Sequence, residues 1–143
     1  MSLSDHFTLD EMTFSQTAVR KGIKNEPPMQ AVVALKNLCE NVLEIVRVHF
    51  DRPIHISSGY RSPALNAAIG GASSSQHCLG EAADITVPGV DNLRLAKWIR
   101  DNTPFDQVIM EGSWVHVSCG PRNRRQALTA HFKNGHATYS EGL

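Results

Sequence analysis

A chain of 143 residues is long enough to bury a hydrophobic core and too short for two domains of ordinary size, so we expect one domain, residues 1–143. Its 14 basic and 14 acidic side chains cancel, which excludes an overall field that would attract nucleic acid or an anionic membrane. Only the stretch "PRNRR", residues 121–125, is locally basic, either as a solvated segment or as a contact for anionic polymers.

The first third of the chain is predicted to be helical. Thr8 followed by Glu11 matches the capping-box pattern and predicts a short helix that starts near Leu9. After the prolines at 27 and 28, apolar residues recur at helical spacing over about five turns and predict the main core helix. These residues are Val32, Leu35, Cys39, Val42 and Val46.

The remainder of the chain is predicted to contain mostly strands. The β-prone runs are "PIHISSGY", "ADITV", "FDQVIM" and "WVHVSC". Between the second and third runs, "DNLRLAKWIRDN" predicts a helix that is capped by Asp91 and buries Leu95, Trp98 and Ile99. Asn134-Gly135 lies between two β-prone runs and predicts a type I′ hairpin. We therefore expect an α+β fold, with N-terminal helices packed on a small, mainly antiparallel sheet.

Two of the seven histidines have neighbours that point to chemistry. His77 lies in a segment rich in glycine and serine, and Asp84 follows it at the start of a predicted strand. Strand alternation in "WVHVS" puts His116 on the face opposite Val115 and Val117. Two histidines and a carboxylate are a zinc set of the catalytic type, with a fourth position left for water. A buried His–Asp hydrogen bond beside an unrelated strand histidine is the alternative.

A serine hydrolase would need a nucleophile, a base and an acid, and Ser75, His77 and Asp84 supply these residue types. Ser75 does not lie on a G-x-S-x-G elbow, and two residues of spacing rarely give the required geometry, so we disfavour this alternative.

Three segments, in the order "SSGYRSPALNAAIGG", "SSSQHCLGEAADI" and "EGSWVHVS", resemble the M15 family of zinc peptidases, especially its short phage and prophage members. The resemblance spans roughly residues 54 to 118, and "HCLGEAAD" matches the family pattern H-x-x-G-x-A-x-D at every fixed position. It implies a hedgehog/DD-peptidase-like fold and one zinc ion per chain, bound by His77, Asp84 and His116. The histidines and the aspartate selected by their chemistry are the same three residues.

The resemblance leaves the general base less well defined. Many relatives carry an acid three positions before the last histidine, where this chain has Ser113, and the nearest carboxylate is Glu111. Strict alternation would point Glu111 away from His116, so a catalytic role for Glu111 requires a bulge at Gly112. The alternative for Glu111 is a solvent-facing residue at a strand end.

Further site residues follow from the same resemblance. It assigns Arg61 to substrate binding and to polarisation near the scissile bond, although a solvated loop arginine is the alternative. By their positions alone, Tyr60 and Ser75, which lies two positions before His77, are expected to line the same cleft and to contact substrate, and Ser118 is expected to do so because it shares a strand face with His116.

The implied function is a zinc-dependent peptidase that hydrolyses peptidoglycan stem peptides, as a D-Ala-D-Ala carboxypeptidase or as a stem endopeptidase. The alternative is a non-catalytic module that zinc stabilises and that binds a wall peptide or a protein partner. We expect a monomer with no nucleic-acid partner and no stable membrane insertion.

The compartment follows from the N-terminus and from the cysteines. "MSLSDHFTLDEM" lacks the basic and apolar regions of a secretory signal. We therefore expect cytoplasmic synthesis and action on the cell wall after release, during phage lysis or from a virion, or secretion if a signal was removed. Cys39, Cys78 and Cys119 form no C-x-x-C pair and are expected to be small buried hydrophobes.

Overall fold

The computed structural model describes residues 1–143 and begins with short elements that cover one side of the core. These are β1 (Ser2–Ser4), β2 (Phe7–Thr8), α1 (Leu9–Thr13) and α2 (Gln16–Lys21). The predicted start of the first helix is confirmed, because the side chain of Thr8 accepts a hydrogen bond from the backbone N–H of Glu11 at 3.2 Å. This helix ends at Thr13, and a second short helix follows, capped by Ser15.

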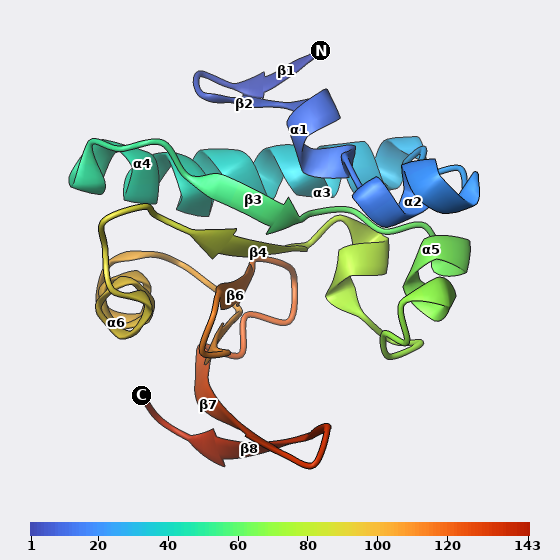
Figure 1. Ribbon diagram of the computed structural model, residues 1–143. Helices are drawn as coiled ribbons and strands as arrows, with labels where there is room; N and C mark the ends of the chain where they lie inside the picture. Colours follow the sequence, from blue (N-terminus) through green and yellow to red (C-terminus); the bar gives the residue numbers. More distant parts are fainter.

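The predicted core helix is present as one long helical segment in three parts. They are α3 (Met29–Leu38), a π-helical turn η1 (Cys39–Leu43) and α4 (Glu44–Phe50). Its inward face is fully buried at Leu35, Cys39, Val42 and Val46, whereas Val32 is only partly buried. Figure 1 shows this segment between the β1–β2 hairpin and the main sheet. No helix of the structure is both long enough and apolar enough to cross a membrane.

The main sheet has six strands in the order β3-β4-β6-β5-β7-β8. They are β3 (His55–Ser58), β4 (Ala82–Thr86), β5 (Gln107–Met110), β6 (Val115–Ser118), β7 (Gln126–Lys133) and β8 (His136–Glu141). All neighbours are antiparallel except β5 and β7, which are parallel. Asn134 and Gly135 both have positive φ and join β7 to β8 as the sequence predicts. The α+β class with a mainly antiparallel sheet is thus confirmed.

One face of this sheet packs on the core. Val108, Val115 and Val117 are fully buried there, and α6 (Asn92–Asn102) packs against β5 and β6. Asp91 caps α6 as expected. The expected burial of Trp98 is only partly correct: its ring is half-buried because it lies at the edge of the core, stacked on His49 with 4.1 Å between ring centroids.

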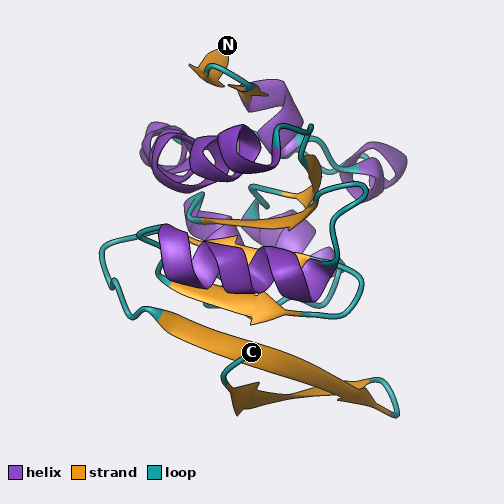
Figure 2. Ribbon diagram, turned by 90° about the vertical axis from the view of Figure 1, so that its left-hand side faces the viewer, coloured by secondary structure: helices purple, strands orange, loops and turns teal.

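The opposite face of the sheet carries the residues of interest. Cross-strand register aligns Ser58 of β3 with Asp84 of β4, Asp84 with His116 of β6, His116 with Ile109 of β5, and Ile109 with Leu128 of β7. Directly opposed residues point to the same side of a sheet. A single row of side chains therefore runs across the sheet from β3 to the C-terminal hairpin, which projects from the body of the molecule (Figures 1 and 2).

The cysteines are all free thiols. Cys39 and Cys119 are buried, as expected, whereas Cys78 is only partly buried. Burial raises the pKa of Cys39 to about 12, so this thiol stays protonated and behaves as a small core residue.

Candidate functional site

His77, Asp84 and His116 meet although the chain separates them by up to 39 positions (116 − 77). Asp84 and His116 are opposed on the adjacent strands β4 and β6, and His77 lies on a 3-10 turn, η2 (Gln76–Leu79), just before β4. Oδ1 of Asp84 lies 3.3 Å from Nε2 of His77 and 3.1 Å from Nδ1 of His116. One ligand atom from each of the three residues lies within 4.8 Å of the other two, which makes them a compact set of donors.

The donor set fits a zinc ion. Nitrogen and oxygen ligands bind zinc at about 2.0 to 2.1 Å, so in a tetrahedron they lie about 3.3 Å apart, close to the two distances above. Nδ1–H of His77 donates to the carbonyl of Gly59 at 2.7 Å, so Nε2 is the nitrogen that faces Asp84. An unprotonated Nε2 and the Asp84 carboxylate would both be acceptors, so a proton or a cation is needed between them.

The electrostatics of Asp84 suit the same role. Burial raises the pKa of Asp84, but the hydrogen bonds and charges of His116 and His77 lower it more, so the pKa lies well below its ordinary value. The carboxylate is therefore ionised although it is buried, as a metal ligand must be.

The turn that follows β3 fixes the position of His77. Gly59 packs so closely on the first helix that an added Cβ would lie 2.2 Å from the carbonyl oxygen of Met12, so only glycine fits. The next residue, Tyr60, donates its N–H to the same carbonyl at 2.8 Å. Asn25 closes the turn by donating to the carbonyls of Thr13 and Tyr60. The N-terminal segment thus holds in place the carbonyl that orients His77.

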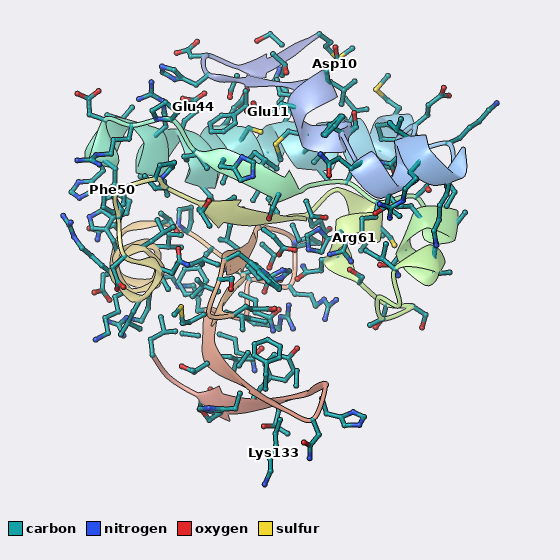
Figure 3. The ribbon with its side chains drawn as sticks, viewed as in Figure 1. Asp10, Glu11, Glu44, Phe50, Arg61 and Lys133 are labelled. Atoms are coloured by element: carbon teal, nitrogen blue, oxygen red, sulfur yellow. The ribbon has the colours of Figure 1, made fainter.

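Arg61 is held at the site by three partners. Its Nε donates to Oγ of Ser58 at 3.0 Å, Nη1 to Oδ1 of Asn66 at 3.0 Å, and Nη2 to Oδ2 of Asp84 at 3.4 Å. A guanidinium has five N–H groups, so two remain for a substrate. Figure 3 shows Arg61 on the side of the sheet where α5 (Pro63–Ala68) lies. The structure thus places Arg61 as a fixed donor and not as a mobile loop side chain.

No role was predicted for Asn66, although this residue is part of the motif "SSGYRSPALN". Its side chain is buried and accepts the hydrogen bond from Arg61. An added Cβ on Gly71 would lie 2.1 Å from Oδ1 of Asn66, so this glycine leaves the room that the contact needs. An asparagine on a short amphipathic segment carries no signal of its own, and only the contact with Arg61 identifies it.

Glu111 lies at the site without the bulge that strict alternation would require. β5 and β6 form a hairpin in which Ile109 opposes His116 and Met110 opposes Val115. The N–H of Glu111 then donates to the carbonyl of Trp114 at 3.0 Å, so these two residues also face each other. The predicted bulge at Gly112 is not needed, because residues 111 to 116 do not form one strand: β5 ends at Met110 and β6 begins at Val115. The hairpin register puts Glu111 on the face of Ile109, and therefore on that of His116.

The carboxylate of Glu111 lies in an environment that favours the protonated form. Burial raises its pKa above the ordinary value of 4.5, and the negative charge of Asp84 raises it further, while His116 and Arg61 oppose this shift. A carboxylate with a raised pKa is the usual form of a general base or acid that works near neutral pH.

These groups line an open cleft of about 690 Å³. It contains His77, Asp84, His116, Arg61, Glu111 and Ser75, together with Trp114 and side chains of the C-terminal hairpin. Ser75 caps the η2 turn, and its Oγ accepts the N–H of His77 at 3.2 Å.

The structure does not bring two of the predicted substrate residues to this cleft. Ser118 is 0% exposed, and its Oγ accepts the backbone N–H of Gln107 at 3.1 Å, because the neighbouring strand covers it. Tyr60 is buried and lines a different hollow of about 440 Å³, on the side of Arg61 toward α1 and α2.

A buried ionic network, which was not predicted from the sequence, lies next to the cleft. Asp106 is 0% exposed and accepts hydrogen bonds from the backbone N–H, Nε and Nη2 of Arg124 and from Nε2 of Gln76. Nη2 of Arg124 also donates to Oε1 of Gln76 at 3.0 Å. Because Gln76 immediately precedes His77, this network ties the η2 turn to the segment that leads into β7.

Comparison with known proteins supports the same interpretation. The chain is 37% identical over 62 residues to the zinc D-Ala-D-Ala carboxypeptidase of Streptomyces albus G. The matched part is 43% of this chain and spans only 24% of that protein. The family model described as Peptidase M15 matches residues 5–118, which is most of the chain and includes all three of the clustered donors. The chain therefore belongs to the M15 peptidase family.

Proposed function

We propose that residues 1–143 act as one zinc peptidase domain, with one zinc ion bound by His77, Asp84 and His116. The observation that carries this proposal is the compact triangle of donor atoms in the lining of an open cleft, next to a partly buried carboxylate and a fixed guanidinium. The zinc carboxypeptidase from Streptomyces albus G, with which the chain shares 37% identity over 62 residues, supports the choice of metal.

A zinc ion held there would polarise the scissile carbonyl and lower the pKa of a bound water. Glu111 accepts the proton of the attacking water and delivers it to the departing amine, and its raised pKa favours both transfers near neutral pH. Arg61 binds the substrate next to the reacting bond through its two free N–H groups and stabilises the developing oxyanion. Ser58 and Asn66 keep its guanidinium in one orientation, so little reorganisation is needed during the reaction.

The proposed substrates are peptidoglycan stem peptides. Cleavage of a terminal D-Ala-D-Ala bond and cleavage within the stem both fit an open cleft of about 690 Å³ with a cationic group beside the metal site. The protein would then act as a monomer on the cell wall, after release by lysis, from a virion or by secretion.

The first experiment measures metal content and cleavage together. We expect one zinc ion per chain by elemental analysis, and a new muropeptide fragment by mass spectrometry that disappears when a chelator removes the metal. The mass of the fragment identifies the bond. A protein without metal would refute the ligand assignment.

The Glu111→Gln variant tests catalysis separately from binding of the metal. It should keep its zinc and its fold and lose turnover by about 10²-fold or more, since proton transfer by a placed side chain contributes about 10²–10⁴-fold. Glu26→Gln is the matched control, because Glu26 is exposed and lies outside the cleft. Full turnover in Glu111→Gln would remove Glu111 from the mechanism. Stoichiometric zinc without cleavage of any wall type would favour a zinc-stabilised binding module.

A further inference from the structure

The C-terminal hairpin, β7–β8, continues the face of the sheet that carries His116. Leu128 of β7 is in register with Ile109, which opposes His116. Alternation along β7 puts Phe132 on the same side as Leu128, and the pairing of Ala130 with Tyr139 adds Tyr139 to it. The family match ends at residue 118, before this hairpin begins. The hairpin thus adds residues to the cleft that the matched region does not contain.

Phe132 and Tyr139 form an exposed aromatic surface within the cleft. Both rings line it, yet they remain 57% and 53% exposed. They are diagonal neighbours on adjacent strands, a distance that aromatic side chains can bridge. Burial raises the pKa of Tyr139, and the negative charge of Glu111 raises it further, so the phenol lies within the field of the proposed base. Rigid exposed aromatic rings are typical of surfaces that contact a ligand.

The other end of the cleft, at the loop that leads into β7, carries one uncommitted positive charge. Two of the three arginines in "PRNRR" are structural: Arg124 binds Asp106, and Arg125 donates to the carbonyl of Thr103 and lies 4.5 Å from the ring centroid of Phe105. Arg122 lines the cleft and has no hydrogen bond or ion pair in the structure. A free guanidinium at the cleft wall is suited to bind a carboxylate.

We propose that the β7–β8 hairpin and Arg122 form the two ends of a subsite for an anionic peptide that extends along the cleft away from the scissile bond. The aromatic rings of Phe132 and Tyr139 pack against the peptide, and Arg122 binds one of its carboxylates. The protein therefore selects extended peptides with free carboxylates over a terminal dipeptide. This inference rests on the proposed peptidase function, because it assigns the substrate of the same site.

The test measures binding as well as turnover. The probes are the stem pentapeptide L-Ala-γ-D-Glu-L-Lys-D-Ala-D-Ala, the same peptide with its carboxylates amidated, and N-acetyl-D-Ala-D-Ala. Each change is made in two backgrounds. In the zinc-loaded Glu111→Gln protein, calorimetry measures Kd without cleavage; in the protein that keeps Glu111, kinetics measure KM and kcat.

The combined Phe132→Ala and Tyr139→Ala change should raise Kd and KM for the pentapeptide about 10-fold, equivalent to about 1.4 kcal/mol, and leave kcat within about 2-fold. Values for the short probe should not change. Arg122→Gln should lower the preference for the free over the amidated pentapeptide about 10-fold. Lys133→Ala with His136→Ala is the matched control: the two residues oppose each other on the other face of the hairpin, and Lys133 points away from the molecule (Figure 3).

The outcomes separate this inference from the proposed function. The subsite would be overturned, and the peptidase function left intact, by either of two results. One is that the hairpin variants cleave the pentapeptide as efficiently as the wild type; the other is that they lose affinity equally for the pentapeptide and for N-acetyl-D-Ala-D-Ala. Hairpin-dependent binding of the pentapeptide without any cleavage would overturn the proposed catalysis and keep the subsite. An unchanged preference for the free acid in Arg122→Gln would exclude Arg122 as the carboxylate-binding group.

Discussion

The buried carboxylate of Asp106 should make the stability of the protein depend on pH in a defined way. Asp106 is wholly buried, and four hydrogen bonds from Arg124 and Gln76 favour its ionised form. Burial raises the pKa of this carboxyl, but these bonds lower it more, from an ordinary value of 3.8 to about 2. Replacement by asparagine removes the charge and places an amide opposite the donors of Arg124 and Gln76.

The magnitude follows from the two pKa values. A pKa that is lower in the folded state stabilises that state above the unfolded pKa, and this contribution is lost as the pH falls through the folded pKa. The difference between the two pKa values corresponds to about 2 kcal/mol at pH 7, and at pH 3 about 1 kcal/mol of it remains. The amide of the Asp106→Asn variant does not titrate, so the gap in unfolding free energy between wild type and this variant should narrow by about 1 kcal/mol from pH 7 to pH 3.

Urea unfolding of both proteins at pH 7 and pH 3, with chelator present throughout, measures this gap. Titration of the other carboxyls is common to both proteins and cancels in the difference. Asp101→Asn is the control: Asp101 is exposed and pairs with the adjacent Arg100, so solvent screening should make the gap for this variant change far less between the two pH values. If the difference in unfolding free energy between the two proteins stays constant or widens toward pH 3, Asp106 is not an ionised buried carboxylate that stabilises the fold.

Three further predictions follow from the site and its supports. If Glu111 is the general base, kcat/KM should fall as the pH drops through the raised pKa of Glu111, so the acid limb of the pH profile should have its midpoint above pH 4.5. A midpoint at or below pH 4.5 would contradict the role of Glu111 as the base. Asn66→Ala should lower kcat/KM about 10-fold with zinc content unchanged, because Arg61 loses one of its three partners, and unaltered kinetics would show that Arg61 does not need this contact. Gly80→Ala should reduce the free energy of unfolding by about 1–3 kcal/mol, because Gly80 has φ +74 and an added Cβ would lie 2.4 Å from the carbonyl oxygen of Ala31. Equal melting temperatures of the wild type and this variant would contradict the prediction.

Periodic patterns in the sequence were sufficient to predict the larger elements. The core helix and α6 each combine an apolar period with an end signal, and Asn134-Gly135 is a turn signal between two β-prone runs; all three elements are present. The β1–β2 hairpin and α5 were not predicted. They are too short to show a period, and contacts with the rest of the fold determine their conformation.

The site was predictable as residue types and less so as geometry. Sequence motifs selected the two histidines and the aspartate, which the structure brings together. The orientation of Glu111 depends on the position of a turn, and alternation within a strand cannot supply it. The network of Asp106, Arg124 and Gln76 joins segments up to 48 positions apart, so no local pattern could indicate it.

The turn that orients His77 and carries Arg61 has a consequence for the order of folding. Asn25 reaches this turn across 35 positions to Tyr60 and across 37 positions to Ser62. Contacts of such sequence separation form only after the loop-closure entropy has been overcome, and therefore later than local helices and hairpins. Helix α6 and the C-terminal hairpin should thus form early, whereas the carbonyl of Gly59 reaches its final position only when the N-terminal third of the chain has docked.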